Sequence, residues 1–253
     1  DDALPPLCRG LAQQSPAMLA ALLGKLPYPR RARLFERATA ELDTTLVEWP
    51  TELLAVLPTR LRDREAARLL GLLRARTDGS WRRELLGLRA IDAARAELER
   101  EGQSAQASER GEAHAALVQA SMRSGEGMPQ TLAWLKRLRN EQDPVRAAAL
   151  GALARVPGRH FSDPAALDAV LSPIFEARVT SWTTRQHVAR VAHQLLSSRA
   201  TEPTSPMFRL GLDLLERLAY DEVAGDVLGR ADRLEDGDAG RVEHGEGVGE
   251  AGQ

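Results

Sequence analysis

Apolar residues along most of the chain recur at intervals of three and four, the spacing of one face of an α-helix. Several of these stretches begin with a capping side chain followed by proline, namely Ser15-Pro16, Asp143-Pro144, Asp163-Pro164 and Ser205-Pro206. The pattern predicts helices at residues 16–24, 30–46, 51–57, 63–75, 81–88, 91–101, 109–123, 129–139, 144–155, 164–178, 183–198 and 206–219. We therefore expect an all-α fold, with a polar loop at Gly102–Ser108.

Composition supports the same fold class. Among the 253 residues, 40 are Ala, 39 are Leu and only 2 are Ile, so the apolar content belongs to helix formers rather than strand formers. Arg outnumbers Lys by 32 to 2, a bias that fits a GC-rich coding genome better than a binding role.

The expected helices come in pairs joined by short turns, which is the pattern of a helical repeat. The clearest pair is Pro129–Arg139 and Pro144–Arg155. In its second helix the apolar stripe is Val145, Ala148, Ala149, Ala152, Leu153 and Val156. A similar pair follows, with Asp163–Val179 before a turn and Thr184–Ser198 after it. Aligning Arg146 with Arg185 gives a period of 39 residues, close to the ~40–47 of HEAT and armadillo repeats.

The segment 139–153 (RNEQDPVRAAALGAL) resembles the HEAT-repeat signature, an Asp-Pro turn followed by Val-Arg and Ala-rich positions. The signature residues here are Asp143, Pro144, Val145 and Arg146. The chain also resembles uncharacterised HEAT-repeat proteins of high-GC bacteria. The resemblance implies a right-handed α-α superhelix, a HEAT-like solenoid of about five to six helix pairs that serves as an interaction scaffold. It also implies that Asp143 and Arg146 form a structural ladder between repeats.

Charge divides the chain into two parts. Residues 221–253 hold ten acidic and three basic residues, a formal charge of −7, which leaves +5 on residues 1–220. Because this last segment is rich in glycine and acids and apolar spacing thins from Asp221, we expect a disordered tail at 221–253. Residues 1–220 form the expected solenoid domain. Its mild positive charge is weak support for a nucleic-acid partner.

The sequence holds few candidates for chemistry. A lone cysteine, Cys8, favours a reducing, cytoplasmic location, and no stretch is apolar enough to span a membrane. His187 and His193, the only near pair of histidines, point to different helix faces, so we expect no metal site, no cofactor and no catalytic residues. Glu97, Glu99 and Glu101 are interpreted as a solvated helix face. Since the chain starts with Asp rather than Met, we expect a segment of a larger protein.

The candidate binding residues gather at the last clear repeat. Trp182, Arg185, Arg190, Arg178 and His187 combine an aromatic with cations, the residue types of interaction hot spots. We therefore expect a non-enzymatic scaffold that binds a protein or peptide partner on a concave face of second helices. The competing interpretation of Trp182 is packing within the turn. The alternative function is a nucleic-acid-binding protein similar to the HEAT-like DNA glycosylases, and salt-dependent DNA binding separates the two.

Overall fold

The computed structural model describes residues 3–177 and 180–220, and all regular elements in these ranges are helices. The N-terminal helices are α1 (Leu4–Gln14), α2 (Pro16–Gly24), α3 (Tyr28–Thr39), α4 (Thr51–Val56), α5 (Thr59–Leu70), α6 (Leu73–Thr77) and α7 (Gly79–Leu86). They are followed by α8 (Ile91–Glu101), α9 (Ala107–Ser124), α10 (Met128–Leu135), the 3-10 turn η1 (Lys136–Asn140), α11 (Asp143–Leu153), η2 (Gly158–His160), α12 (Pro164–Phe175) and α13 (Trp182–Ser198). A last helix covers 206–220. The all-α prediction is confirmed.

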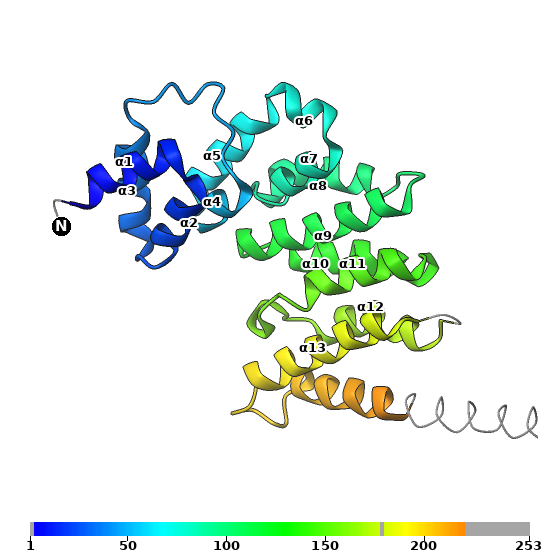
Figure 1. The fold of residues 1–253 in the computed structure, drawn as a ribbon. Coiled ribbons are helices and arrows are strands. Elements are labelled where there is room, and N and C mark those ends of the chain that lie inside the picture. The colour runs from blue at the N-terminus through cyan, green and yellow to red at the C-terminus, as the bar shows by residue number, and fades with distance from the viewer. Residues whose placement is uncertain (1–2, 178–179, 221–253) are drawn as a thin grey trace, which may run out of the picture.

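The helices pack in neighbouring pairs that follow one another from the N-terminal lobe to helix 206–220, coloured orange (Figure 1). In each C-terminal pair a first helix leads into a second: α8 into α9, α10 with η1 into α11, and α12 into α13. The second helices α7, α9, α11 and α13 lie side by side, each against the next. This row is the frame on which the candidate functional residues are placed.

Two large apolar cores hold the pairs together. One extends from Cys8 to Leu88 and the other from Val118 to Leu214, with a small cluster around Leu98 between them. In α11 the predicted stripe is confirmed, because all its members are buried except the half-buried Ala148. Ala148 instead lies against Gly111 of α9, where an added Cβ would come within 3.1 Å of it.

In the N-terminal lobe one helix was not predicted and two predicted helices were wrong in extent. The sequence analysis missed α1, in which two prolines occupy the first turn, where a missing N–H does no harm. The helix predicted at 30–46 ends at Thr39, and the following loop contains a turn in which the Thr45 N–H donates to Asp43 at 3.0 Å. The helix predicted at 63–75 is two helices, α5 and α6, separated at Gly71.

Helix capping matches the prediction in part. The Asp163 carboxylate accepts from the Ala166 N–H at 3.0 Å, and Ser205 Oγ accepts from the Phe208 N–H at 3.3 Å. Ser15 makes no side-chain cap, and Asp143 lies inside the first turn of α11 rather than before it. The side chain of Asp143 is directed to the next helix pair instead. The predicted tail, 221–253, lies outside the described residues.

Candidate functional site

The row of second helices presents a shallow surface made of small and polar residues. We call this the second-helix face and define it by residues on four helices and just after one of them: Ser80 and Glu84 of α7, Glu112, Ala115, Gln119 and Arg123 of α9, Ala148 and Gly151 of α11, Arg155 just after α11, and His187 and Arg190 of α13. Residues of α7 and α9 together line one hollow of about 210 Å³ on it. A second hollow extends the surface to Thr51 and Glu52 of α4.

Small residues let these helices lie close together. Gly111 of α9 faces Ala148 of α11, and the His187 ring lies over Gly151, where an added Cβ would come within 3.0 Å of Nε2. The helices run in the same direction, because like ends are in contact: Asp143 at the start of α11 contacts Thr184 at the start of α13, and Arg123 at the end of α9 contacts Gly87 just after α7. The result is a flat surface without large apolar knobs.

One end of the second-helix face is acidic. Glu52 and Glu84 are exposed on α4 and α7, and the Thr51 hydroxyl donates to Glu84 at 3.3 Å. Glu48 lies beside them and pairs with Arg74 at 2.8 Å. A partner meeting this end would be favoured by positive charge.

The other end of the face is basic. Arg155 and Arg190 are exposed, and neither makes an ion pair or hydrogen bond with another described residue. Burial, together with the positive charges of Arg62 and Arg155, lowers the pKa of Arg123 to about 10. Burial also lowers the pKa of His187, as do the charges of Arg190 and Arg155. Arg155 and Arg190 therefore form the basic end, whereas Arg123 lines the same hollow as Glu52 and Glu84.

The structure divides the predicted binding residues between two surfaces. His187 and Arg190 belong to the second-helix face, whereas Trp182 and Arg185 line a separate hollow with Leu218 of helix 206–220. Trp182 is 66% exposed, so it is not packed into the turn as the competing interpretation had it. Arg178 lies outside the described residues.

The repeat-signature residues join neighbouring pairs. Asp143 of α11 accepts from the Ser181 N–H at 3.2 Å and from the Thr184 hydroxyl at 2.9 Å, both at the start of α13. Burial opposes ionisation of Asp143, but these hydrogen bonds and the charge of Arg146, at 3.7 Å, outweigh it and lower its pKa. Val145 and Arg146 are buried, and Pro144 occupies the first turn. Asp143 therefore contacts the next helix pair through amide and hydroxyl groups.

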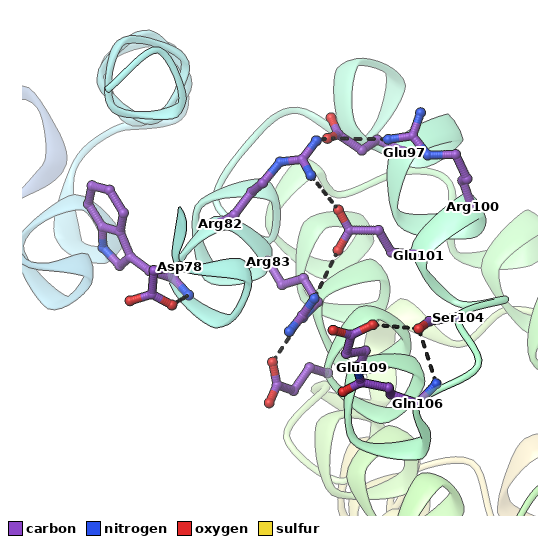
Figure 2. A network of polar contacts seen from close by, with 11 residues as sticks. Asp78, Arg82, Arg83, Glu97, Arg100, Glu101, Ser104, Gln106 and Glu109 are labelled. Carbon is purple, nitrogen blue, oxygen red and sulfur yellow. Dashed lines mark hydrogen bonds and ion pairs between the residues drawn. The ribbon is translucent and has the colours of Figure 1, made fainter. Parts of the chain in front are cut away.

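Carboxylates of α8 form a polar network with α7 and α9, shown in Figure 2. Arg82 pairs with Glu97 and, at 3.0 Å, with Glu101. Arg83 pairs with Glu101 of α8 at 3.3 Å and with Glu112 of α9 at 2.9 Å. The interpretation of a solvated face was therefore wrong for Glu97 and Glu101, because packing of α7 against α8 brings Arg82 and Arg83 onto them. Glu99 pairs with Arg95 of its own helix at 3.4 Å. Glu97, Glu101 and Glu112 thus each have an arginine partner on a neighbouring helix, so these ion pairs connect α7, α8 and α9.

The sequence analysis gave no role to His114. Its side chain is fully buried, neither ring nitrogen has a hydrogen-bond partner among the described residues, and an added Cβ at Gly102 would meet its ring at 2.9 Å. Burial lowers the pKa of His114 to about 4, so the ring is neutral at pH 7. A polar residue on an apolar helix face was the only signal in the sequence.

Comparison with models of protein families, with curated proteins and with solved structures finds no match. In the described ranges no group of three or more His, Cys, Asp or Glu side chains could hold a metal ion. No helix within those ranges is both long and apolar enough to cross a membrane.

Proposed function

We propose that the chain is a HEAT-like solenoid scaffold, acting in the cytoplasm without catalysis of its own, that binds a protein or peptide partner on the second-helix face. The observation that carries the proposal is the charge segregation on this face, acidic at Glu52 and Glu84 and basic at Arg155 and Arg190. A flat surface with opposite charges at its two ends suits an extended partner segment.

The charges and side-chain sizes on the second-helix face indicate the kind of partner segment that would fit it. A segment with basic residues at one end and acidic residues at the other would place each opposite its complement. Small side chains such as Ala115 and Ala148 leave room for partner side chains between the charged ends. Arg155 and Arg190 are the proposed anchors, since guanidinium groups bind carboxylates with two parallel hydrogen bonds.

The test is selection of peptides from a random display library on the full chain. We expect selected peptides to carry acids at one end, and the variant Arg155→Glu/Arg190→Glu to bind them at least about ten-fold more weakly. Arg209→Glu is the matched control, because Arg209 is exposed on helix 206–220 and away from this face. It should leave binding unchanged, and neither variant should lower the melting temperature.

Two results would count against the proposal. Peptides whose affinity is unaffected by the double charge reversal would place the site elsewhere. Binding of a double-stranded DNA oligonucleotide that falls steeply with salt would favour the nucleic-acid alternative.

A further inference from the structure

A further hollow lies beside the acidic end of the second-helix face, lined by the start of α4, the residues just before it, and helices α6 and α7. Its volume is about 320 Å³. We call it the acidic hollow and define it by its lining residues: Glu48, Trp49, Pro50, Thr51, Glu52, Arg74, Trp81 and Glu84. Thr51, Glu52 and Glu84 also line the hollow that extends the second-helix face, so the two hollows adjoin. A partner segment on the face would therefore reach the acidic hollow.

Buried aromatic side chains hold the walls of the acidic hollow in place. Trp49 is 1% exposed and packs edge-on against Phe35, with 5.7 Å between the ring centroids. Trp81 is also buried, and its main-chain N–H donates to the Asp78 carboxylate at 2.9 Å, which caps α7. Because both tryptophans belong to the N-terminal core, the carboxylates around them project from a fixed frame.

The acidic hollow has more negative charge than the fold neutralises. It contains three carboxylates and one guanidinium. Arg74 pairs with Glu48 at 2.8 Å. Glu84 accepts a hydrogen bond from the Thr51 hydroxyl but, like Glu52, has no arginine or lysine within ion-pair distance among the described residues. Glu52 and Glu84 are therefore two exposed carboxylates that share one hollow and lack a cationic partner in that part of the chain.

Arg74 shows how the acidic hollow holds a cation. Its guanidinium carbon lies 4.4 Å from the centre of the Trp81 ring, while the same group pairs with Glu48. An aromatic face and a carboxylate together favour a planar cation, because a guanidinium stacks on the ring and donates in its own plane. The hollow thus already contains one guanidinium and has carboxylate acceptors left for a second.

The acidic hollow also has a hydrogen-bond donor without an acceptor. Trp49 lines it, and the buried indole N–H of this side chain has no acceptor among the described residues. A buried donor left unpaired is costly. A carbonyl of a bound ligand is one group that would satisfy it.

We propose that the acidic hollow binds the guanidinium of one arginine side chain of the partner, with Glu52 and Glu84 as its acceptors. This inference rests on the proposed function, because it states what the acidic end of the second-helix face recognises. A guanidinium presents five donors in a fixed plane and can bridge two carboxylates, whereas the ammonium of lysine is compact and more strongly hydrated. Arg74 repels the incoming cation and competes for the same carboxylates. The hollow therefore selects arginine over lysine, and Arg74 limits its affinity.

The first experiment uses small ligands, so that it does not depend on any peptide partner. The probe is Nα-acetyl-arginine amide, titrated at constant ionic strength into the isotope-labelled full chain while the tryptophan indole N–H resonances are recorded by NMR. Trp49 and Trp81 should shift together and saturably, whereas Trp134 and Trp182, which do not line the hollow, should not. The citrulline analogue, which is neutral and nearly isosteric, should cause no saturable shift. The lysine analogue should bind at least about three-fold more weakly than the arginine probe.

Charge variants then test which side chains bind the probe. Glu52→Gln/Glu84→Gln should weaken binding of Nα-acetyl-arginine amide at least about ten-fold. Glu126→Gln/Glu216→Gln is the matched control, because both residues are exposed, lie outside the hollow and carry the same charge. Binding by this control should stay within about two-fold of the parent chain. Arg74→Gln should strengthen binding at least about three-fold, because it removes the internal competitor.

Any of four results would overturn the inference: no saturable shift of the Trp81 indole with the arginine probe, equal affinity for the arginine and lysine probes, unchanged affinity in Glu52→Gln/Glu84→Gln, or weaker binding in Arg74→Gln. The outcome is separate from that of the proposed function. Display peptides that depend on Arg155 and Arg190, in a chain whose hollow binds no arginine probe, would refute this inference alone. A hollow that binds the probe, in a chain that selects no peptide, would refute the scaffold proposal alone.

Discussion

Arginine side chains in this protein bind main-chain carbonyls at the ends of helices. Arg62 donates to the carbonyls of Leu88 at 3.2 Å, Leu57 at 3.4 Å and Arg123 at 3.3 Å. Arg31 donates to three carbonyls in the same way. A guanidinium has five donors in a fixed plane, which an ammonium group cannot reproduce. The excess of Arg over Lys therefore has a structural use beyond the coding bias to which the sequence analysis assigned it.

Because His114 is buried in its neutral form, we predict that the protein loses stability in mild acid. The folded state keeps the ring neutral down to about pH 4, whereas the unfolded chain binds a proton near pH 6.5. Protons thus favour the unfolded state in this window, so the free energy of unfolding is greatest above pH 6.5 and falls as the pH drops to 4. This group alone accounts for up to about 3 kcal/mol. Urea unfolding of His114→Leu between pH 7 and pH 4 should show a shallower decline than the parent chain.

The control for this prediction is His193→Gln, because His193 is exposed on α13. His187 and His160 also have lowered pKa values and contribute to the decline in both the parent and the variant. An identical pH dependence in His114→Leu and the parent chain would mean that the ring is not held neutral in the fold.

At the scale of the helices, the sequence was most informative where an apolar stripe ran unbroken. The stripe of α11, from Val145 to Val156, was correct because each position meets another helix. The break at Gly71 was missed because glycine is tolerated within helices as well as at their ends. The pairing of Arg82 with Glu101 was also missed, because contacts between helices leave no periodic signal in the sequence.

The hydrogen bonds of Asp143 predict a specific coupling between α11 and α13. In Asp143→Ala the Ser181 N–H and the Thr184 hydroxyl lose their shared acceptor, which should cost about 1–3 kcal/mol. Hydrogen exchange should quicken in the first turn of α13 and remain slow in α9. Asp163→Ala, which removes a cap from α12 only, is the matched control and should leave the first turn of α13 protected. Equal exchange at α13 in both variants would contradict the coupling.

At the scale of the whole molecule, we expect a mutation in one of the two apolar cores to destabilise mainly that core. Leu153 is fully buried in the C-terminal core, so Leu153→Ala should cost about 2–5 kcal/mol. Exchange should quicken throughout 128–214 and much less in 8–88, because among the described residues the two cores are separate clusters, with the small cluster near Leu98 between them. Leu19→Ala, in the other core, should show the reverse distribution. An unchanged melting temperature in Leu153→Ala would show that this side chain is not a core contact.

The candidate site was predictable only in its residue types. Trp182, Arg185 and Arg190 were chosen because aromatics and cations dominate interfaces, and helix geometry already placed the two arginines about 140° apart. Their division between two surfaces could not be predicted, because it depends on where Leu218 and Arg155 lie after packing. The acidic end of the second-helix face was missed for the same reason.

The common direction of the second helices has an electrical consequence. Parallel neighbours align their dipoles, which is unfavourable unless charges compensate at the two edges of the row. At the edge of the row where the helices begin, Asp78, Glu109 and Asp143 lie in or just before the first turns of α7, α9 and α11. At the edge where the helices end lie Arg123 and Arg155. The spacing of an apolar stripe is the same in either chain direction. A helix packed in the opposite direction, however, would place its N-terminal carboxylates beside the C-terminal carbonyl oxygens of its neighbours. The charged edges thus specify the polarity of each helix, which the apolar residues leave undetermined.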